Sequence, residues 1–545
     1  MVPGVGPPVR LAGDTRRVRV LVFHGYLLRG TGSNVYNAAL ARALAAEGHE
    51  VHLLCQDRQA AELSWVDAVG DWDRGELQVR ELRSQVRITA YRPDIGRVLP
   101  LYVADDYEGF DARPFPELYD AEVEAYLEAC VGAVAEVAER AEAEVALANH
   151  LIMGPAVLAR ALGGRVPYAV KVHGSALEYT VRPHRERFLP YAREGLAGAS
   201  GVLVGSRHTA ESLWEVMGDP ELPGRTRLGP PGVDTATFRP RRTAEAAAGV
   251  AALAERLEGA SDGWGGEPGA AAALRSLDPG RDRIVAYVGK LIVSKGVDLL
   301  LAAWPLVVAE VPDARLCVVG FGTYREPLGR MLAALREADL GAVREIARRG
   351  RELEGGPPGE LTYLASFIDG LEGERREEYR RAGRRAAEQV VFTGRLEHED
   401  LPDLLPACEA QVVPSTFPES FGMVAAEAAA CGALPLSAAH SGLAEVTTTL
   451  RASVPGALGE LLSFERGPAA VEEIAAKLLR WLGLDPGERA AASAALSATA
   501  RARYGWDAVA RGVVAAAQGR LDGAARAGRG GAMRRPLQGV ILRTP

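Results

Sequence analysis

Two carboxylates lie on either side of a predicted helix start in residues 418–432. A short apolar segment at residues 410–414 precedes them and has the character of a buried strand, and Gly432 is a natural helix stop. The helix start between Glu419 and Glu427 presents free backbone N–H groups and a partial positive charge, which suit a phosphate. Carboxylates are good acceptors for the paired hydroxyls of a sugar. The stretch therefore indicates a site for a sugar joined to a phosphate.

Two lysines follow a predicted strand in the same half of the chain. Lys290 comes directly after the strand end, and Lys295 comes just before the next predicted helix. Their ammonium groups can neutralise a diphosphate, as a departing nucleoside diphosphate requires when negative charge builds on it. Lysines in loops are more often only solvated, so this interpretation depends on the carboxylate stretch in the same predicted domain.

Further candidates follow strands in the first half. His173 ends a strand where side chains project into an α/β cleft, and His150 has a similar position, although a structural or exposed histidine is the commoner case. The glycine-rich loop at residues 29–34 lacks the dinucleotide-binding spacing and a Walker lysine. Its glycines let backbone N–H groups approach a ligand, but a plain tight turn explains the loop equally well. Six histidines have no other candidate site residues near them in the sequence, and no role is assigned to them. They are His24, His49, His52, His208, His398 and His440.

The composition is that of an ordinary globular protein with more than one domain. A chain of 545 residues exceeds what one hydrophobic core usually supports, and 48% of its residues are hydrophobic and 25% charged. The net charge of −8 argues against a chain-wide attraction to nucleic acid or anionic lipid. No nucleic-acid partner is expected, whereas contact with a membrane surface and the oligomeric state stay open.

The five cysteines lack any C-x-x-C spacing and lie in apolar or helical contexts, which favours buried, reduced thiols over disulfides or a zinc site. No cluster has metal-ligand spacing, so no obligatory metal is expected. The first residues lack the apolar region of a signal peptide, and no run of about 18 apolar residues occurs. A cytoplasmic protein that does not span a membrane is predicted.

Strand-like and helix-like stretches alternate along most of the chain. The strands are predicted at residues 17–25, 51–55, 86–92, 144–150, 168–174 and 201–206, and again near 287, 314–322, 390–396, 410–415 and 433–438. Such alternation predicts parallel sheets covered by helices, with ligands beyond the carboxyl ends of the strands. The fold class is α/β, with two doubly wound domains in tandem.

The turn-rich and Ala/Gly-rich region after residue 230 marks the boundary between the domains. A long charged segment at residues 324–389 is predicted to be a solvated helical insertion, with a lid or partner-binding element as the alternative. The Gly/Arg-rich end of the chain is expected to be disordered. The predicted parts are a leader (1–16), an N-terminal domain (17–235), a C-terminal domain (236–502), a last helix (503–518) and a tail (519–545).

The chain resembles the retaining glycosyltransferases of family 4, which have the GT-B fold of two Rossmann-like domains facing across a cleft. The resemblance runs from Arg17 to about Gln518. Its most specific part is the E-x7-E spacing of Glu419 and Glu427 in a PESFG frame, supported in order by the HG at 173–174, PPGVD at 230–234 and GK...KG at 289–296. It also implies that the last helix crosses back onto the N-terminal domain.

The resemblance implies a role for each matching residue. Glu427 would bind the donor ribose and Glu419 the transferred sugar, while Lys290, where the family usually has arginine, and Lys295 would hold the diphosphate. The backbone amides of Phe421, Gly422, Met423 and Val424 would hold the sugar and phosphate. His173 would lie beside the donor sugar, with Gly32 near the diphosphate and Ser33 and Asn34 on the acceptor side.

The implied reaction transfers a sugar from a nucleotide-sugar donor to a hydroxyl of a small-molecule or glycan acceptor, with retention at the anomeric carbon. A UDP-linked hexose or N-acetylhexosamine is favoured over a guanosine-linked mannose. Two alternatives remain, a nucleotide-sugar epimerase of the same fold and a non-catalytic nucleotide-sugar-binding protein. An isomerised donor formed without any acceptor would indicate the epimerase.

Overall fold

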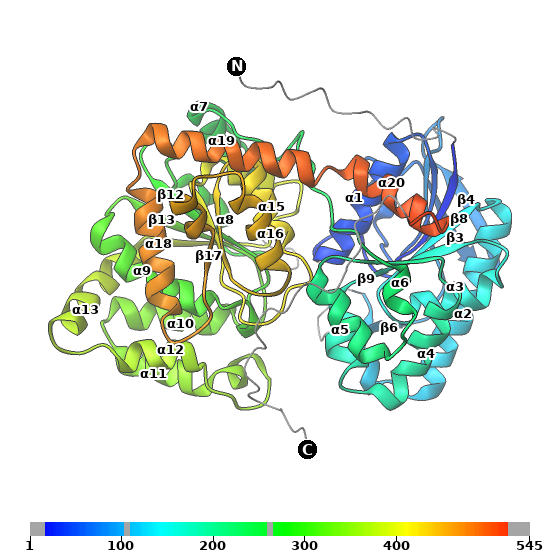
Figure 1. Cartoon of the computed structure of the whole chain (residues 1–545), viewed down its shortest axis with the longest axis horizontal. Helices are drawn as coiled ribbons and strands as arrows, with labels where there is room; N and C mark the ends of the chain where they lie inside the picture. The colour runs from blue at the N-terminus through cyan, green and yellow to red at the C-terminus, as the bar shows by residue number, and fades with distance from the viewer. Residues whose placement is uncertain (1–16, 103–108, 259–264, 522–545) are drawn as a thin grey trace.

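The computed structural model describes residues 17–102, 109–258 and 265–521. The predicted leader and residues 522–545 of the predicted tail lie outside these ranges. Two α/β lobes lie side by side, and each is built on its own sheet (Figure 1). The predicted α/β class with two doubly wound sheets is confirmed.

The sheet of the N-terminal lobe has the strand order β11-β10-β9-β8-β1-β2-β5-β3-β4, and every pairing except β3–β4 is parallel. Its strands are β1 (Arg19–Phe23), β2 (Glu50–Leu54), β3 (Ala68–Asp73), β4 (Glu76–Glu81), β5 (Ile88–Arg92), β8 (Val145–Asn149), β9 (Tyr168–Val172), β10 (Gly201–Val204) and β11 (Thr226–Leu228). The order reverses between β1 and β8. In open α/β sheets ligands bind at such a switch point, beyond the carboxyl ends of the strands.

The sheet of the C-terminal lobe is entirely parallel in the order β14-β13-β12-β15-β16-β17. Its strands are β12 (Arg283–Val288), β13 (Ala314–Val319), β14 (Val390–Gly394), β15 (Ala410–Val413), β16 (Leu434–Ala438) and β17 (Ser463–Phe464). The switch point is between β12 and β15. The loop after β12 carries the predicted lysines. The loop after β15 carries Glu419, and the helix that follows this loop carries Glu427.

Helix α20 (Trp506–Ala517) belongs to the N-terminal lobe although it ends the described chain. It follows α19 (Pro486–Arg503), which lies in the C-terminal lobe, and packs against α1 (Gly32–Ala46) and strands β8–β10 (Figure 1). Arg511 of α20 is also within 3.2 Å of Glu47 at the end of α1. The chain therefore crosses between the lobes twice.

The segment at residues 324–389 is helical, as the sequence predicted, but it packs into the core of its lobe and is not merely solvated. It forms α10 (Arg325–Arg336), α11 (Leu340–Arg349), α12 (Thr362–Asp369) and α13 (Gly373–Glu388), in the lower left of Figure 1. Leu328, Phe367 and Tyr379 of these helices are part of the core of the C-terminal lobe. This core packing was missed because the exposed Arg and Glu residues dominate the composition and obscure a narrow apolar stripe.

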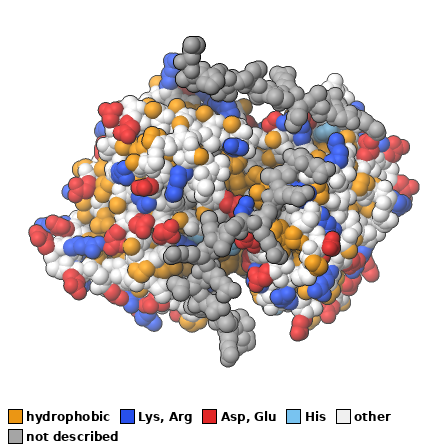
Figure 2. Space-filling model, in the orientation of Figure 1, with side chains coloured by type: hydrophobic (Ala, Val, Ile, Leu, Met, Phe, Trp, Pro, Cys, Tyr) orange, Lys and Arg blue, Asp and Glu red, His pale blue; other side chains and the backbone are white. Residues whose placement is uncertain are grey.

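The remaining features agree with a globular chain. The five cysteines are all buried and unpaired. Within the described ranges, no helix is both long and apolar enough to cross a membrane. On the face seen in Figure 2, acidic and basic side chains are interspersed.

Replacing Tyr379 by alanine tests whether α13 is part of the core. Tyr379 is 2% exposed and its hydroxyl donates to the carbonyl of Ala302 at 2.8 Å, so Tyr379→Ala should lower the free energy of unfolding by about 3–5 kcal/mol. Arg376→Ala on the exposed face of the same helix should change it by less than about 0.5 kcal/mol. Equilibrium denaturation measures both, and equal small effects would show that α13 is a peripheral helix.

Candidate active site

A cavity of about 510 Å³ lies between the two lobes, at the switch points of both sheets. All the residues that the sequence nominated line it, although they come from segments nearly 400 residues apart. They are Gly32, Ser33, Asn34, His173, Lys290, Lys295, Glu419, Phe421, Gly422, Met423, Val424 and Glu427. Parallel strands explain the convergence, because the loops at their carboxyl ends all open toward the same space.

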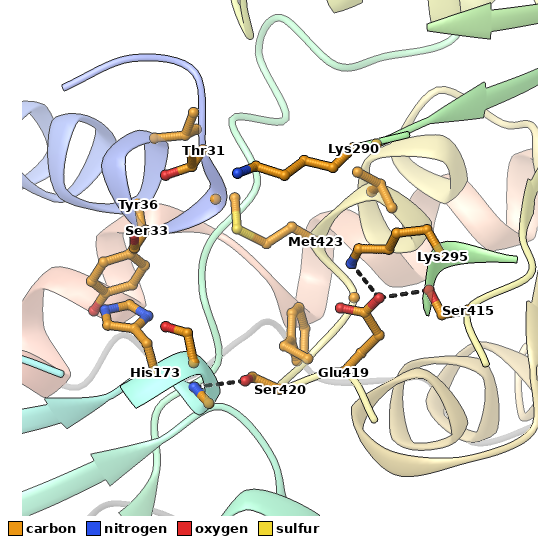
Figure 3. A pocket seen from close by; sticks show the side chains of 18 of the residues that line it. Thr31, Ser33, Tyr36, His173, Lys290, Lys295, Ser415, Glu419, Ser420 and Met423 are labelled. Atoms are coloured by element: carbon orange, nitrogen blue, oxygen red, sulfur yellow. Dashed lines mark hydrogen bonds and ion pairs between the residues drawn. The ribbon is translucent and has the colours of Figure 1, made fainter. Parts of the chain in front are cut away.

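Glu419 is held by several groups of its own lobe (Figure 3). Lys295 Nζ donates to its Oε1, Ser415 Oγ donates to the same oxygen at 2.6 Å, and Ser441 Oγ accepts from its backbone N–H at 2.8 Å. Burial disfavours the ionised carboxyl, but the Lys295 ammonium and the Ser415 hydroxyl outweigh it and lower the pKa of Glu419. Glu419 is therefore an ionised acceptor paired with a cation.

Glu427 is 1% exposed and has a partner that sequence reasoning missed. His398 Nε2 donates to Glu427 Oε1 at 2.8 Å, and the imidazole packs against Phe238. Burial favours the neutral imidazole, yet the Glu427 carboxylate raises the pKa of His398. No partner of Glu427 Oε2 is present among the described residues, so this oxygen is available to a ligand hydroxyl.

The helix start predicted between Glu419 and Glu427 is present in the structure. Gly422 adopts φ +109° and is the N-cap of α15 (Met423–Ala430). The first backbone N–H groups of this helix lie at the cavity wall and have no carbonyl acceptor one turn earlier in the chain. The first turn of α15 holds no acidic residue. Such a terminus favours a negatively charged group.

The glycine-rich loop of the N-terminal lobe faces this helix across the cavity. Thr31 is the N-cap of α1 without a side-chain cap, and the first turn holds no acidic residue. A Cβ built on Gly32 would meet no protein atom within 4 Å. A side chain at this position would therefore extend into open space at the cavity wall. Lys290 extends toward Thr31 from the opposite lobe (Figure 3).

His173 lies at the end of β9, where its ring packs edge-on against Tyr36 at 5.2 Å. Burial, His150, Lys171 and His24 together hold the pKa of His173 well below its usual range, so the imidazole is neutral. Its Nε2–H donates to Asn149 Oδ1 at 2.9 Å.

Lys171 is a second residue that sequence reasoning missed. It is 2% exposed, donates to the Gly229 carbonyl, and lies 5.4 Å from the centroid of the Tyr36 ring. Burial alone lowers the pKa of Lys171 to about 7, since no carboxylate of the described residues pairs with it. The sequence predicted the strand at residues 168–174 that contains Lys171, but nothing in it marked this lysine as buried or as part of the cavity wall.

The structure revises one acceptor-side expectation. Asn34 lines the cavity but is 1% exposed, and its amide is bonded to His24 and to the carbonyl of Arg29. Its hydrogen bonds therefore serve the loop and not an acceptor. His150 is also buried against the cavity, with neither ring nitrogen bonded and a positive φ of 68°.

Direct hydrogen bonds join the lobes along one side of the cavity. Gly174 N–H donates to Ser420 Oγ at 2.8 Å (Figure 3). Glu445 of α16 (Ser441–Arg451) accepts from the backbone N–H groups of Arg207 and His208 at 3.0 and 3.1 Å. These amides begin α5 (Arg207–Met217), so a carboxylate of one lobe caps a helix of the other. The lobes are thus in a closed arrangement.

Comparison with known proteins assigns the chain to a family. The family model described as a glycosyl transferase 4-like domain matches residues 31–232, and the model described as glycosyl transferases group 1 matches residues 363–489. The chain belongs to the family 4-like glycosyltransferases of the GT-B fold. The matches fall on the N-terminal and C-terminal lobes, respectively.

Relatives of this chain include D-inositol 3-phosphate glycosyltransferases. One from Frankia alni is 27% identical over 418 residues, covering 74% of this chain and 82% of the relative. One from Mycobacterium sp. (strain JLS) is 30% identical over 236 residues, covering 43% of this chain and only 36% of the relative.

Solved structures share its fold. Sucrose-phosphate synthase from Thermosynechococcus elongatus is 20% identical with a TM-score of 0.52, covering 91% of this chain and 97% of that one. Anabaena HepE is 18% identical with a TM-score of 0.53, covering 91% and 98%.

The His398–Glu427 pair can be tested by titration. The raised pKa of folded His398 means that the pair stabilises the protein fully below about pH 6.5, and that this contribution is lost as the pH rises through the folded value. In Glu427→Gln, burial and Arg42 lower the pKa of His398 and only Glu399, the last-ranked of the influences on it, raises it, so this pKa should fall below about 6.5. An NMR titration of the imidazole measures both proteins. An unchanged pKa in Glu427→Gln would show that the pair does not form.

Proposed function

We propose that this glycosyltransferase moves a hexosyl or N-acetylhexosaminyl group from a UDP-linked donor to a hydroxyl of a small-molecule or glycan acceptor, with retention. One observation carries the proposal. Two held carboxylates and a lysine pair of one lobe face a glycine-rich helix start of the other across a single cavity. A nucleotide sugar has the hydroxyls and the diphosphate that these groups would bind.

Each group has a part in this scheme. Glu427 Oε2 accepts from a ribose hydroxyl, and Glu419 accepts from a hydroxyl of the transferred sugar. Lys290, Lys295 and the first amides of α15 hold the diphosphate and stabilise the charge that builds on it as the sugar departs. The closed lobes position the two substrates and exclude water, which would otherwise compete with the acceptor.

The state of the carboxylates at the cavity wall bears on the route that the transfer would take. Among the described residues that line it, these are Glu178, Glu419 and Glu427. Glu178 accepts from Arg182 at 3.0 Å and from Ser212, and the other two are bonded to Lys295 and His398. A covalent mechanism needs a carboxylate poised to attack the anomeric carbon. Each of the three already has an oxygen bonded within the protein, and the free Oε2 of Glu427 is the atom assigned to the ribose hydroxyl.

We therefore propose a same-face displacement. The bond between the anomeric carbon and the phosphate oxygen breaks while the acceptor oxygen bonds to that carbon from the same side. The acceptor proton passes to the departing phosphate oxygen, so no protein base is required. The protein contributes orientation and cationic stabilisation.

Related proteins support the choice of substrates. HepE was solved with UDP and with UDP-glucose, and starch synthase IV, another protein of this fold, with ADP. We place UDP first on this basis. The D-inositol 3-phosphate glycosyltransferases among the relatives support a small, hydroxyl-rich acceptor.

A thermal-shift panel tests the donor. UDP should raise the melting temperature more than GDP, ADP or dTDP, because a ligand that binds only the folded state stabilises it in proportion to the logarithm of its excess over Kd.

Replacing Lys295 by alanine tests the diphosphate site. Removing a charged hydrogen bond costs about 1.5–3 kcal/mol, so Lys295→Ala should weaken UDP binding about tenfold to a hundredfold and abolish turnover.

Lys477→Ala is the matched control for that substitution. Lys477 lies on α18 (Ala470–Leu482), donates to the Glu460 carbonyl at 2.8 Å, and does not line the cavity. Its removal should leave UDP binding and turnover unchanged. Lys295→Ala with the affinity and turnover of the unmodified protein would contradict the site assignment.

A further inference from the structure

The chain contains only three asparagines, and all three lie in one buried hydrogen-bond chain. Asn34 and Asn149 are 1% exposed and Asn37 is fully buried. They join the glycine-rich loop after β1 to His173 at the end of β9. Asn34 lines the cavity, whereas Asn37 and Asn149 do not.

The chain of bonds starts at the imidazole in the cavity wall. His173 Nε2 lies 2.9 Å from Asn149 Oδ1, Asn149 Nδ2 donates to Asn37 Oδ1 at 2.7 Å, and Asn37 Nδ2 lies 3.0 Å from His24 Nδ1. His24 Nε2 is then 3.0 Å from Asn34 Oδ1. Each side chain bonds to the next without a gap.

The end of this hydrogen-bond chain that lies away from His173 is bonded to backbone carbonyls. These carbonyls fix which atom donates and which accepts in each bond. Asn34 Nδ2 donates to the Arg29 carbonyl at 2.6 Å, and His24 Nε2 lies 3.0 Å from the Leu27 carbonyl. Asn37 Nδ2 also donates to the Ser33 carbonyl at 2.8 Å. A carbonyl can only accept, so none of these three groups can reverse its orientation.

The direction of the far end dictates the tautomer of His173. Since Asn37 must present Nδ2 to Ser33 and His24, its Oδ1 must accept from Asn149. Asn149 then turns its oxygen toward His173, so the proton of the imidazole is on Nε2. Of the described residues none is a hydrogen-bond partner of His173 Nδ1, which is left with its lone pair.

We propose that the three asparagines and His24 are positioning residues that hold His173 as a hydrogen-bond acceptor in the cavity and tie its ring to the glycine-rich loop. The group that Nδ1 accepts from is a hydroxyl of the transferred sugar, and in this respect the inference rests on the proposed function. Because these hydrogen bonds connect the glycine-rich loop to the ring, a movement of the loop on binding a phosphate would also shift the His173 side chain.

The surroundings keep His173 in the neutral form that this role requires. The groups that face it are the imidazoles of His24 and His150, the Lys171 ammonium and the phenol of Tyr36. None of them carries a negative charge near neutral pH that would favour the imidazolium, and burial lowers the pKa of His24 itself to about 4. The acceptor nitrogen therefore persists across the physiological pH range.

The tautomer can be read directly by NMR of the intact protein labelled with ¹⁵N-histidine. The His173 resonances, assigned by their loss in His173→Gln, should show a neutral ring with the proton on Nε2 from pH 6 to pH 8. A proton on Nδ1 or a mixture of tautomers in the unmodified protein would overturn the proposal. This readout needs no substrate, so it decides the proposal even if no nucleotide sugar is turned over.

Asn37→Leu breaks the chain at a residue that does not line the cavity. It should lower kcat about tenfold while the KM for the donor stays within about twofold, and replace the single His173 tautomer by a mixture. The matched control is Gln411→Met, which removes a buried amide of the C-terminal lobe that has no hydrogen-bond partner for either terminal atom. The control should retain kcat and the tautomer.

The outcomes separate the positioning role from the proposed function. Asn37→Leu with unchanged kcat and an unchanged tautomer would refute the positioning role while leaving the proposed function intact. An unmodified protein that transfers no sugar from any nucleotide donor would refute the proposed function. If Asn37→Leu does not fold, the tautomer of His173 in the unmodified protein decides whether the positioning role holds.

Discussion

The site depends on one constraint, that the carboxyl ends of two parallel sheets open toward the same cavity. At each switch point neighbouring strands lead to helices on opposite faces, so the loops after them diverge and leave a space between. The glycine-rich loop and His150 follow β1 and β8, whereas Lys290 and Ser415 follow β12 and β15. Each lobe supplies part of the polar lining, and neither part surrounds a ligand alone.

Within the cavity, charge is arranged in compensated pairs. A buried ion is costly unless it is paired and hydrogen-bonded, and Glu419 and Glu427 each meet this condition through Lys295 and His398. The Lys171 ammonium is the exception, since only burial acts on its pKa and its bonded partner is a carbonyl. The site is thus preorganised before any ligand arrives, which reduces the reorganisation required during reaction.

The sequence predicted those parts of the fold that have a strong local signal. The buried strands are runs of β-branched and apolar residues, and the Glu419–Glu427 spacing is visible in the chain. The hairpin β3–β4 was missed because its turn, Arg74-Gly75, lacks the usual Asn-Gly or Asp-Gly pair, although both residues adopt positive φ. His398 was missed because its partner lies 29 residues away, a distance that only the fold bridges. The asparagine chain likewise joins residues 112 positions apart.

The proposed mechanism is tested most directly by the anomeric configuration of the product. The protein is incubated with an α-linked UDP-sugar and an acceptor, and the configuration of the new glycosidic bond is read by NMR before any further reaction. Same-face displacement predicts an α-linked product and release of UDP. A β-linked product would contradict the same-face displacement, and an isomerised nucleotide sugar formed without acceptor would contradict sugar transfer itself.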